Sequence, residues 1–555
     1  MKALLSMTLG EMLERNARLY PSNLAVKYFE VKYERTYYDF NNDVDKIARG
    51  LLGMGLRKGD HIAVWAMNCP EWIILFFACA RIGVVLVTVN TGYKAKELHY
   101  ILEQSDSKAL FLCNDLRGID STKIICSICP ELKNAKPGKF HSKTLPFLRA
   151  VISLDNDYDG MYNWSQIGFF GASITDKEYT ARKKSVLPTD VSNILYTSGT
   201  TGFPKGVMLT HFNILNNAAI FGYSFGIKRN DKLLAMLPFF HIFAMTLTLV
   251  MPLFSGSAII PLLAYNPVRA LHAIEYEKIS IMPAVPTMFM GIIQHIDFEK
   301  YNISSLRSGL VGATLVPPAI YMTILNKLKL KNLVNAYGQT ECSPAITIPP
   351  VDAPLEKKMK SVGKVLKFSE IKIIDPETKE TVAPDVNGEI CVRGCNVMKG
   401  YYKMPEATAE TIDRDGWLHT GDIGVVDADG YYNITGRLKD MIIRGGENIF
   451  PKELEDLIIT HPAVAEVQVV AVPSERYGEE VFAYIIPRKN AIVTEKEIKK
   501  YVSDKMAAFK VPAYVAFINE MPMNASGKVL KYVLKEMAIE RLGIKTESAP
   551  KNDKN

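Results

Sequence analysis

Short apolar runs alternate with longer amphipathic stretches from the N-terminus to about Gly436. The spacing Thr8-x-x-Glu11 predicts a capped helix start, and apolar residues at helical spacing predict further helices over 39–52, 71–82 and 95–104. The runs between them predict strands at 24–29, 35–38, 61–65, 84–89 and 109–113. Short strands that are apolar along their whole length are buried on both faces, as in parallel sheets covered by helices. The pattern therefore predicts a large α/β body of several subdomains with parallel sheets.

A different order of elements begins beyond Gly436. Here the pattern predicts a helix, two alternating strands, a helix, a strand and a last helix, at 452–460, 464–472, 481–487, 494–504, 514–518 and from about 529. Such a mixture predicts a small α+β unit. We expect an N-terminal domain over residues 1–436, a hinge at 437–440, a mobile C-terminal lid domain over 441–545 and a disordered polar tail over 546–555.

Residues 233–268 carry no formal charge, which raises the question of a membrane span. A spanning helix needs about 20 apolar residues without serious breaks, and Pro238, Pro252 and Pro261 interrupt this stretch. We therefore expect buried core and a pocket wall here, not a transmembrane helix. The N-terminal segment differs from a signal peptide because Glu11 interrupts a short apolar part, so we expect a cytoplasmic protein.

The overall composition is that of an ordinary globular protein, with 48% hydrophobic and 23% charged residues. The net charge of +7, from 66 basic and 59 acidic residues, is spread over 555 positions. Without clustered Lys and Arg we expect no nucleic-acid partner. Eight cysteines are too few for a disulfide scaffold, and Cys126-x-x-Cys129 has no second pair to complete a zinc site. We interpret that pair as two buried thiols.

The strongest chemical signal is the segment 197–206, which directly follows an apolar run. It combines glycines, hydroxyl side chains and a lysine, with no acidic residue: Thr197, Ser198, Gly199, Thr200, Thr201, Gly202 and Lys205. Glycines let backbone N–H groups turn towards an anion, while the hydroxyls and the lysine add donors and positive charge. The segment lacks the G-x-x-x-x-G-K-[ST] spacing of the common nucleotide loop. We nevertheless interpret it as a loop that binds a triphosphate.

This segment resembles the phosphate loop of the adenylate-forming (ANL) superfamily, which includes acyl-CoA synthetases, firefly luciferases and peptide-synthetase adenylation domains. Four further segments resemble, in order, the adenine and magnesium motif, the ribose motif, the hinge and the catalytic-lysine motif of that superfamily: 336–341, 417–422, 436–440 and 522–528. The sequence of segment 441–449 is most similar to that of medium- and long-chain fatty acyl-CoA synthetases. The resemblance extends over more than half of the chain.

The resemblance implies how the nucleotide is held. Tyr337 would offer its ring to the adenine, and Asp422 would accept hydrogen bonds from the ribose hydroxyls, with Arg437 as a donor. The loop residues named above belong to the same expected ATP/AMP-binding set, together with Gly312 and Ala313.

The resemblance also implies three catalytic residues: Lys528, Glu341 and Thr340. Glu341 is a hard oxygen ligand that suits Mg²⁺, and Thr197 would help to hold this ion, whereas Thr340 would contact the α-phosphate. Lys528 would neutralise charge where a carboxylate attacks the α-phosphorus, because one anion must approach another. Loss of one preorganised donor of this kind costs about 10²–10³ in rate.

A second half-reaction requires CoA to reach the acyl-adenylate. The resemblance implies that the C-terminal unit swings about Lys439 and presents a CoA-binding segment: Arg444, Gly445, Gly446 and Glu447. Without side chains, the two glycines would let the narrow pantetheine arm pass close to the backbone. A simple turn is the alternative interpretation of this pair.

The substrate class is inferred from the absence of acidic residues in one apolar segment. Segment 239–245 contains no carboxylate, so a substrate ammonium group would be buried there without a partner. We expect an acid with an apolar tail and a pocket formed by Phe240, His241, Phe243, Gly312 and Gly338, with further candidate walls at Met245, Thr246, Met282, Val311 and Cys342. His241 either positions the carboxylate or is a hydrogen-bonded core histidine. Gly338 stands where acetate-activating relatives carry tryptophan, which favours chains longer than propionate.

These features predict a magnesium-dependent, AMP-forming fatty acyl-CoA synthetase whose partners are a fatty acid, ATP and CoA. The alternatives are a fatty acyl-AMP ligase that loads a carrier protein and an aryl-CoA ligase. A non-catalytic binding protein is disfavoured because Lys528, Glu341, Asp422 and Arg437 are all present. Transient contact with a membrane surface and a homodimeric state are left open.

Overall fold

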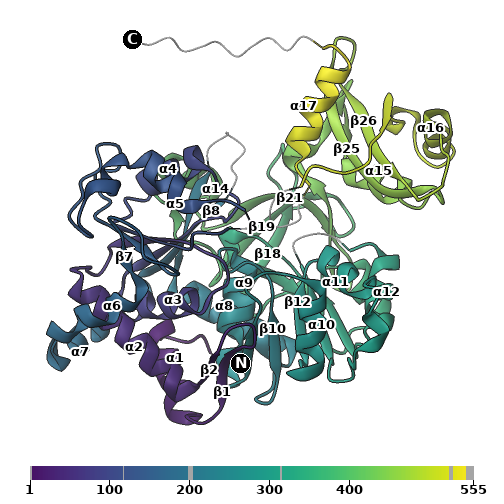
Figure 1. Cartoon of the computed structure of the whole chain (residues 1–555). Helices are drawn as coiled ribbons and strands as arrows, with labels where there is room; N and C mark the ends of the chain where they lie inside the picture. The colour runs from purple at the N-terminus through teal and green to yellow at the C-terminus, as the bar shows by residue number, and fades with distance from the viewer. Residues whose placement is uncertain (1–2, 117, 198–203, 313–315, 524–528, 545–555) are drawn as a thin grey trace. The chain divides into compact units, whose positions relative to one another are not determined.

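The chain folds into two compact units, drawn in Figure 1 as a ribbon. The computed structural model describes residues 3–116, 118–197, 204–312, 316–523 and 529–544. The first unit comprises residues 1–371 and 392–418, and the second comprises residues 372–391 and 419–555. The predicted fold class, a large α/β body with parallel sheets and a smaller α+β unit, is confirmed. The predicted hinge at 437–440 concerns a motion and stays a prediction.

The first unit contains an eight-stranded sheet in the order β20-β9-β8-β4-β3-β5-β6-β7. The strands from β8 to β7 are parallel to their neighbours, whereas β9 runs antiparallel to β8, and β20 antiparallel to β9. The bounds are β3 (His61–Trp65), β4 (Val85–Thr88), β5 (Ala109–Leu112), β6 (Ala150–Ser153), β7 (Tyr162–Asn163), β8 (Val191–Thr197), β9 (Lys205–Thr210) and β20 (Gly400–Tyr401). β4 and β5 are buried along their whole length, as expected for parallel strands covered on both faces.

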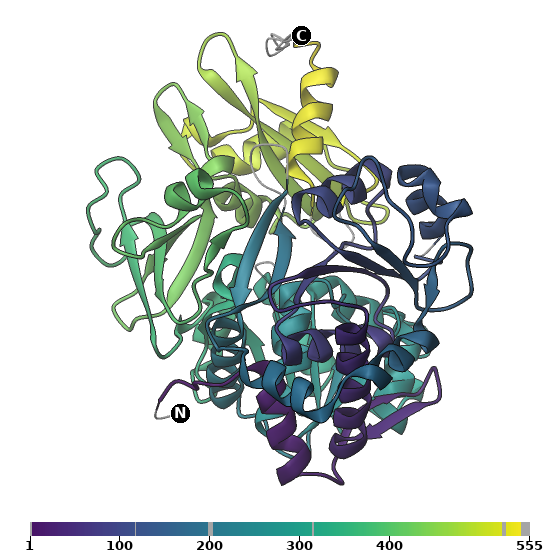
Figure 2. The ribbon, with the colours of Figure 1, turned by 90° about the vertical axis from the view of Figure 1, so that its left-hand side faces the viewer.

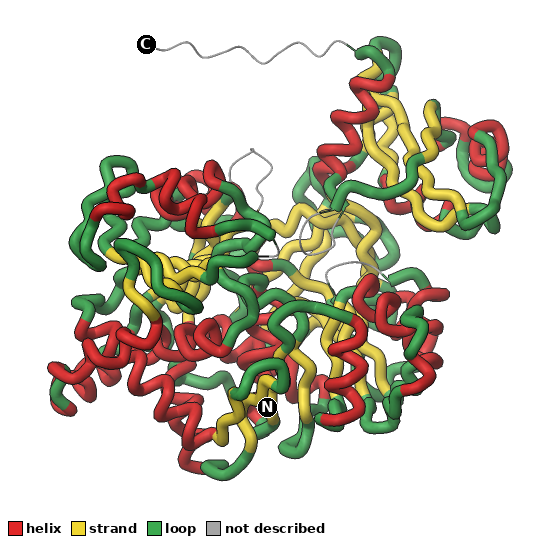
Figure 3. The backbone as a smooth tube through the Cα atoms, viewed as in Figure 1, coloured by secondary structure: helices red, strands yellow, loops and turns green. Residues whose placement is uncertain are grey.

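Six helices belong to this part of the chain: α2 (Tyr37–Gly53), α3 (Pro70–Ile82), α4 (Ala95–Gln104), α5 (Ser121–Ile128), α6 (Trp164–Phe170) and α7 (Asp176–Lys184). Figure 3 shows helices in red beside the strands in yellow. The central helix α3 starts with Pro70 and ends at Gly83, whose φ of 73° suits glycine. It is buried almost all round, and its one buried cation, Arg81, pairs with Asp45 at 2.7 Å. The strand predicted at 35–38 lies two residues earlier, at Tyr33–Thr36, because Thr36 caps α2 by accepting a hydrogen bond from the backbone N–H of Asp39.

The second large sheet of this unit has the order β14-β13-β12-β10-β11-β1-β2. All its neighbours are parallel except β1 and β2. The bounds are β1 (Leu24–Tyr28), β2 (Tyr33–Thr36), β10 (Lys232–Ala235), β11 (Ala258–Pro261), β12 (Ile281–Ala284), β13 (Ser308–Val311) and β14 (Asn332–Asn335). The capping box predicted at Thr8 and Glu11 starts α1 (Leu9–Leu19). The other helices are α8 (His211–Phe225), α9 (Ile242–Ala244), α10 (Pro267–Tyr276), α11 (Pro286–Ile293) and α12 (Pro318–Lys327).

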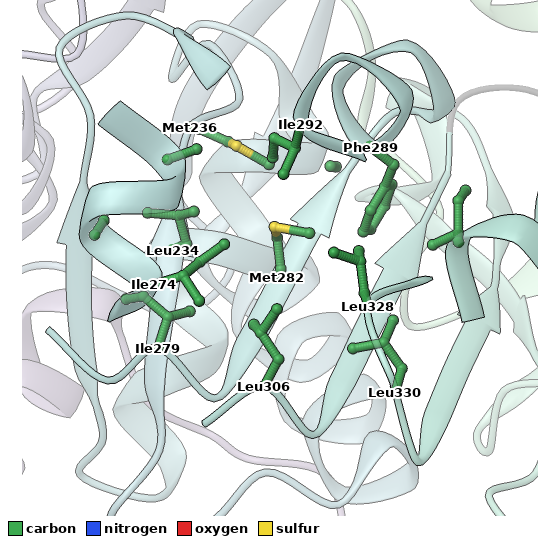
Figure 4. Close-up of a cluster of buried hydrophobic side chains, with 14 of the residues drawn as sticks. Leu234, Met236, Ile274, Ile279, Met282, Phe289, Ile292, Leu306, Leu328 and Leu330 are labelled. Carbon is green, nitrogen blue, oxygen red and sulfur yellow. The ribbon is translucent and has the colours of Figure 1, made fainter. Parts of the chain in front are cut away.

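A buried apolar cluster joins this sheet to helices α10, α11 and α12 (Figure 4). Met282 lies among its members, between residues of the strands and of the helices. Val311 belongs to the same cluster. These two predicted pocket walls are therefore part of the packed core between the sheet and the helices.

The charge-free stretch 233–268 is divided among several short elements. It passes through β10, α9, a π-helical turn at Met245–Val250, a 3₁₀ turn at Met251–Phe254 and β11. Among the residues that the structure describes, no helix has the length and apolar character needed to cross a membrane. A small third sheet of the unit contains β15 (Tyr337–Gly338), β16 (Ala345–Ile348) and β17 (Lys364–Val365), and the remaining helices are α13 (Leu355–Lys360) and α14 (Pro405–Thr411).

The second unit begins within a four-stranded sheet in the order β18-β19-β21-β22, and the division between the units crosses β18 and β19. The bounds are β18 (Ser369–Ile374), β19 (Gly388–Gly394), β21 (Leu418–Val426) and β22 (Tyr432–Arg437). The five-stranded sheet that follows is visible from another side in Figure 2. Its strands are β23 (Ile442–Arg444), β24 (Glu447–Ile449), β25 (Val464–Ser474), β26 (Gly478–Pro487) and β27 (Tyr514–Phe517).

Alternation along β25 distributes the helices of the second unit over both faces of this sheet. Val467 and Val469 pack in one apolar cluster with α15 (Pro451–Ile458) and α16 (Glu495–Ser503). Val470 and Val472 pack in another with α17 (Lys531–Arg541). Because side chains of a strand point alternately to opposite faces, this two-sided packing explains why so small a unit has two apolar clusters.

Candidate active site

The predicted phosphate loop joins two antiparallel strands, β8 and β9. Thr197 ends β8 and Lys205 begins β9, and the two residues lie directly opposite each other in the register. The structure thus brings the two ends of the loop together. Ser198, Gly199, Thr200, Thr201 and Gly202 lie outside the described residues.

Glu341 lies close to Thr197 although 144 residues separate them. It belongs to a single 3₁₀ turn, Thr340–Cys342, that follows β14 and β15. The Oγ1 atom of Thr197 is 3.5 Å from Oε1 of Glu341. A carboxylate and a hydroxyl are oxygen donors of the kind that Mg²⁺ prefers, so the residues present fit this ion.

Tyr401 was not among the residues predicted from the sequence. Its hydroxyl donates a hydrogen bond of 3.0 Å to Oε1 of Glu341, and the ammonium of Lys205 lies 5.0 Å from the centre of its ring. Burial, together with the negative charge of Glu341, raises the pKa of Tyr401 well above its usual value, so the phenol keeps its proton and acts as a donor. Tyr401 lies in no recognised motif, and its place beside Glu341 follows from the pairing of β20 with β9 and from a backbone hydrogen bond of 2.8 Å from Met398 to Glu341.

The segment with the predicted adenine residue forms part of the small third sheet. Tyr337 is half-buried and pairs with Thr347 of β16. At Gly338, a β-carbon would overlap the carbonyl oxygen of Pro344. Backbone packing alone therefore accounts for this glycine, and its predicted part in opening the acyl pocket stays a prediction.

Two predicted acyl-pocket residues, Phe240 and Phe243, lie in one buried segment, and a third, Gly312, lies beside Phe243. Phe240 and Phe243 are buried, and a β-carbon on Gly312 would lie 3.1 Å from the ring of Phe243. His241 caps α9 by accepting a hydrogen bond of 3.3 Å at Nδ1 from the backbone N–H of Phe243. The structure thus supplies a hydrogen-bond partner for His241, in line with the alternative interpretation of a hydrogen-bonded histidine. Contact of His241 with a substrate carboxylate stays a prediction. Directly after α9 comes the π-helical turn, a feature that is frequent at functional sites.

Asn68 is a second residue that the sequence did not reveal. Its buried side chain donates from Nδ2 to the carbonyl oxygens of Leu237 (3.0 Å) and Leu262 (3.2 Å), and accepts at Oδ1 from the backbone N–H of Phe239 (2.9 Å). The bonds to Leu237 and Phe239 fix the segment that leads into Phe240 and His241, and the third ties it to Leu262 after β11. A buried asparagine after an apolar run is a weak sequence signal, because its partners lie more than 160 residues away.

The two predicted ribose residues form an ion pair in the second unit. Asp422 of β21 and Arg437 of β22 are opposite each other in the antiparallel register, and Nε of Arg437 donates to Oδ1 of Asp422 at 2.8 Å. Asp422 is buried, with 4% of its surface exposed. The pairing holds a carboxylate and a guanidinium side by side, so both groups are preorganised.

The predicted CoA-binding segment is a tight hairpin between β23 and β24. Gly445 and Gly446 form its turn with φ values of 60° and 90°, which glycine adopts without strain. The guanidinium of Arg444 donates to Glu480 at 2.7 Å and lies 4.4 Å from the centre of the Tyr477 ring. The alternative interpretation of Gly445 and Gly446 as a simple turn therefore has a structural basis. Contact of this segment with CoA stays a prediction.

The remaining predicted residues lie apart from these contacts. Glu447 and Lys439 are exposed, the latter in a 3₁₀ turn at Leu438–Asp440 directly after β22. Lys528 and Ala313 lie outside the described residues.

The first unit thus holds an oxygen cluster beside a glycine-rich segment and a buried apolar wall, and the second unit holds a carboxylate–guanidinium pair. The family model described as "AMP-binding enzyme" matches residues 13–402, and the model described as "AMP-binding enzyme C-terminal domain" matches residues 453–528. The chain belongs to the AMP-binding enzyme family. The expected membership of the adenylate-forming superfamily is thereby confirmed.

Named relatives agree with this family over nearly the whole chain. YngI of Bacillus subtilis (strain 168), which carries a provisional acyl-CoA synthetase name, is 43% identical over 545 residues, covering 98% of this chain and 99% of the relative. A human mitochondrial medium-chain acyl-CoA ligase is 37% identical over 551 residues, covering 98% of this chain and 89% of the relative. The o-succinylbenzoate CoA synthetase of Bacillus subtilis, solved with its acyl-adenylate intermediate, is similar with a TM-score of 0.77 at 27% identity, covering 96% of this chain and 99% of that chain. These matches confirm the expected class of enzyme, an AMP-forming acyl-CoA ligase that uses ATP and CoA.

Proposed function

We propose that this ligase activates fatty acids of medium to long chain. The observation that carries the proposal is the apolar wall at Phe240 and Phe243, in a segment without any carboxylate from residue 239 to 268. An amino-acid substrate would bury an unpaired ammonium there, at a large free-energy cost. Similarity to a relative named as a medium-chain acyl-CoA ligase supports the same substrate class.

In the first half-reaction, an oxygen of the fatty acid carboxylate attacks the α-phosphorus of ATP, and the bond to pyrophosphate breaks. Glu341 and Thr197 would hold Mg²⁺, which supplies positive charge to the phosphate oxygens when bound. Tyr401 fixes the carboxylate of Glu341 through its hydrogen bond. By the same proposal, Tyr337 and the Asp422–Arg437 pair hold the nucleoside, whereas Thr340 and Lys528 act at the α-phosphate.

In the second half-reaction, the sulfur of CoA attacks the acyl carbonyl carbon, its thiol proton is lost, and AMP leaves. We assign the required change of pose to the hinge at Lys439, which is exposed and follows β22 directly. The turn at Gly445 and Gly446 would then border the pantetheine arm. In the described structure, a β-carbon on Gly446 would meet no atom within 4 Å, which supports an open backbone at this point.

An aryl-CoA ligase is the second candidate function. It is favoured by the likeness to a solved synthetase whose substrate is an aromatic acid. Aromatic and aliphatic acids present similar apolar surfaces to a wall of phenylalanine side chains. Each buried CH₂ is worth only about 0.8 kcal/mol, so two carbons change the preference by roughly fifteenfold.

The deciding experiment measures pyrophosphate and AMP release by the purified protein with ATP and Mg²⁺. Straight-chain acids from acetate to stearate and a set of benzoates are compared, each with and without CoA. Turnover that requires both CoA and an aliphatic acid is the expected result. Turnover confined to benzoates would support the aryl-CoA ligase. A single burst of pyrophosphate without CoA-driven turnover would contradict both and indicate a ligase for a carrier protein.

We further propose a reducing compartment, the cytoplasm, as the location of the enzyme. All eight cysteines are free thiols. Disulfides are rare where glutathione and thioredoxin keep thiols reduced.

A further inference from the structure

A cluster of three metal-ligating side chains lies in the second unit and shares no residue with the candidate active site. Glu389 and Cys391 come from β19, and His419 comes from the neighbouring strand β21. Because Glu389 and Cys391 are two positions apart on a strand, they lie on the same face of the sheet. One ligand atom from each of the three residues lies within 4.8 Å of the other two.

The distances within this cluster resemble those between ligands of one tetrahedral zinc ion. The Nδ1 atom of His419 is 3.0 Å from Oε2 of Glu389 and 3.5 Å from Sγ of Cys391. Bond lengths of about 2.0 Å to nitrogen and oxygen and about 2.3 Å to sulfur imply separations of about 3.3 Å between N and O and about 3.5 Å between N and S. Little movement is therefore needed for Nδ1 of His419 to share an ion with each of the other two atoms, which lie within 4.8 Å of each other.

Hydrogen bonds orient the three side chains before any ion is bound. Nδ1 of His419 can donate to Oε2 of Glu389, and Sγ of Cys391 lies 4.0 Å from the backbone carbonyl oxygen of Glu389. The other oxygen of Glu389, Oε1, accepts a hydrogen bond of 3.2 Å from the backbone N–H of Gly421. This bond fixes the carboxylate with Oε2 directed at the other two side chains.

We propose that Glu389, Cys391 and His419 form a binding site for a divalent cation of intermediate softness, Zn²⁺. Thiolate and imidazole ligands favour Zn²⁺, whereas Mg²⁺ is bound by oxygen atoms. The site therefore differs in chemistry from the one at Glu341 and Thr197. Cys391 binds as the thiolate, so its proton passes to the solvent for each ion bound. The side chain of His419 is 23% exposed, which gives water access to a fourth ligand position.

The test uses the full-length protein, stripped of metal with a chelator, kept reduced and held in excess Mg²⁺. Co²⁺ is titrated as a spectroscopic substitute, because a cobalt–thiolate bond gives an intense charge-transfer absorption in the near ultraviolet. We expect a single Co²⁺ to bind with this absorption and Zn²⁺ to displace it. Cys391→Ala should abolish the absorption and lower the Zn²⁺ affinity by at least about tenfold, since even loss of a ligand's supporting partner costs 10- to 100-fold.

Two further variants keep the result independent of folding defects. His419→Lys places an ammonium group opposite Glu389, and an ammonium group has no lone pair to bind a metal, so the Zn²⁺ affinity should fall as well. Cys395→Ala removes a cysteine of the same segment that lies outside the cluster, and should bind as the unaltered protein does. Absence of the thiolate absorption from the unaltered protein would overturn the proposal. So would its persistence in Cys391→Ala, which would assign the thiolate to another cysteine, such as the Cys69–Cys113 pair.

Discussion

Replacing Tyr401 by phenylalanine removes one hydrogen bond from the residue proposed to hold Mg²⁺. The hydroxyl of Tyr401 donates to Oε1 of Glu341 at 3.0 Å, and the other hydroxyl near this atom, that of Thr197, is farther away at 3.5 Å. Tyr401→Phe keeps the ring that packs against Lys205. The substitution therefore tests the orientation of the carboxylate and leaves the surrounding packing in place.

The size of the effect follows from the charge on the acceptor. A hydrogen bond to a charged group contributes about 1.5–3 kcal/mol, and each 1.36 kcal/mol corresponds to a factor of ten. The expected loss is thus about 10- to 100-fold, which is also the range found when a metal ligand loses a supporting partner. We expect the free Mg²⁺ concentration that gives half-maximal adenylation to rise by this factor. The KM for the fatty acid should stay unchanged.

The assay is pyrophosphate release at saturating ATP and fatty acid over a range of free Mg²⁺. Tyr402→Phe is the matched control, because the neighbouring tyrosine loses a comparable hydrogen bond, of 2.9 Å to Asp106, at a different carboxylate. It should leave the Mg²⁺ dependence as it is. An unaltered Mg²⁺ dependence in Tyr401→Phe would refute the positioning role of this residue. If Glu341→Gln were also without effect, the proposed metal site itself would be wrong.

Three more outcomes are expected. Asn68→Ala, which removes two hydrogen bonds to the segment before the acyl wall and a third to Leu262, should raise the KM for the fatty acid at least tenfold while the KM for ATP stays within twofold; equal changes in both would contradict a local role. Asp422→Asn, which weakens the pair with Arg437, should raise the KM for ATP but not for 2′,3′-dideoxy-ATP, which lacks both ribose hydroxyls, whereas an equal rise for both would remove the ribose assignment. Burial lowers the pKa of His211 from 6.5 to about 4, so the unfolded chain takes up a proton first as the pH falls. The free energy of unfolding should then drop by about 2 kcal/mol between pH 7 and pH 5 through this residue, and denaturant unfolding of His211→Gln should show a correspondingly smaller drop.

Local patterns predicted individual helices and strands closely. The helix expected at 95–104 and the strand at 61–65 have these same bounds in the structure. The start of α1 was also predicted, since Thr8 and Glu11 form a capping box through contacts only three residues apart. The pairing of strands was harder to predict, because it joins distant segments. For example, β20 lies beside β9 although almost 200 residues separate them.

The sequence predicted the candidate-site residues that lie in recognised motifs. It did not reveal those that are linked to the site only by individual long-range hydrogen bonds. Glu341 and Asp422 lie in recognised segments, but Tyr401 and Asn68 act through partners that no local pattern contains. The sequence also gave no sign that Arg444 is engaged by Glu480. Single long-range contacts of this kind depend on the folded backbone, whereas glycine-rich and acidic motifs reflect the chemistry of the ligand itself.

The parallel sheets explain how residues that are far apart in the sequence come to lie at the same edge of a sheet. In open α/β sheets, ligands bind outside the carboxyl ends of the strands. Gly312 directly follows β13 and Tyr337 follows β14, two adjacent parallel strands, and the segment that leads to Phe240 follows β10 of the same sheet. In the other large sheet, Asn68 and Thr197 come after or at the end of β3 and β8, which both run parallel to β4. A polar or glycine-rich segment immediately after a fully apolar run is therefore the informative signal in this sequence, because the direction of the strands alone brings such segments to the edge where open α/β sheets bind their ligands.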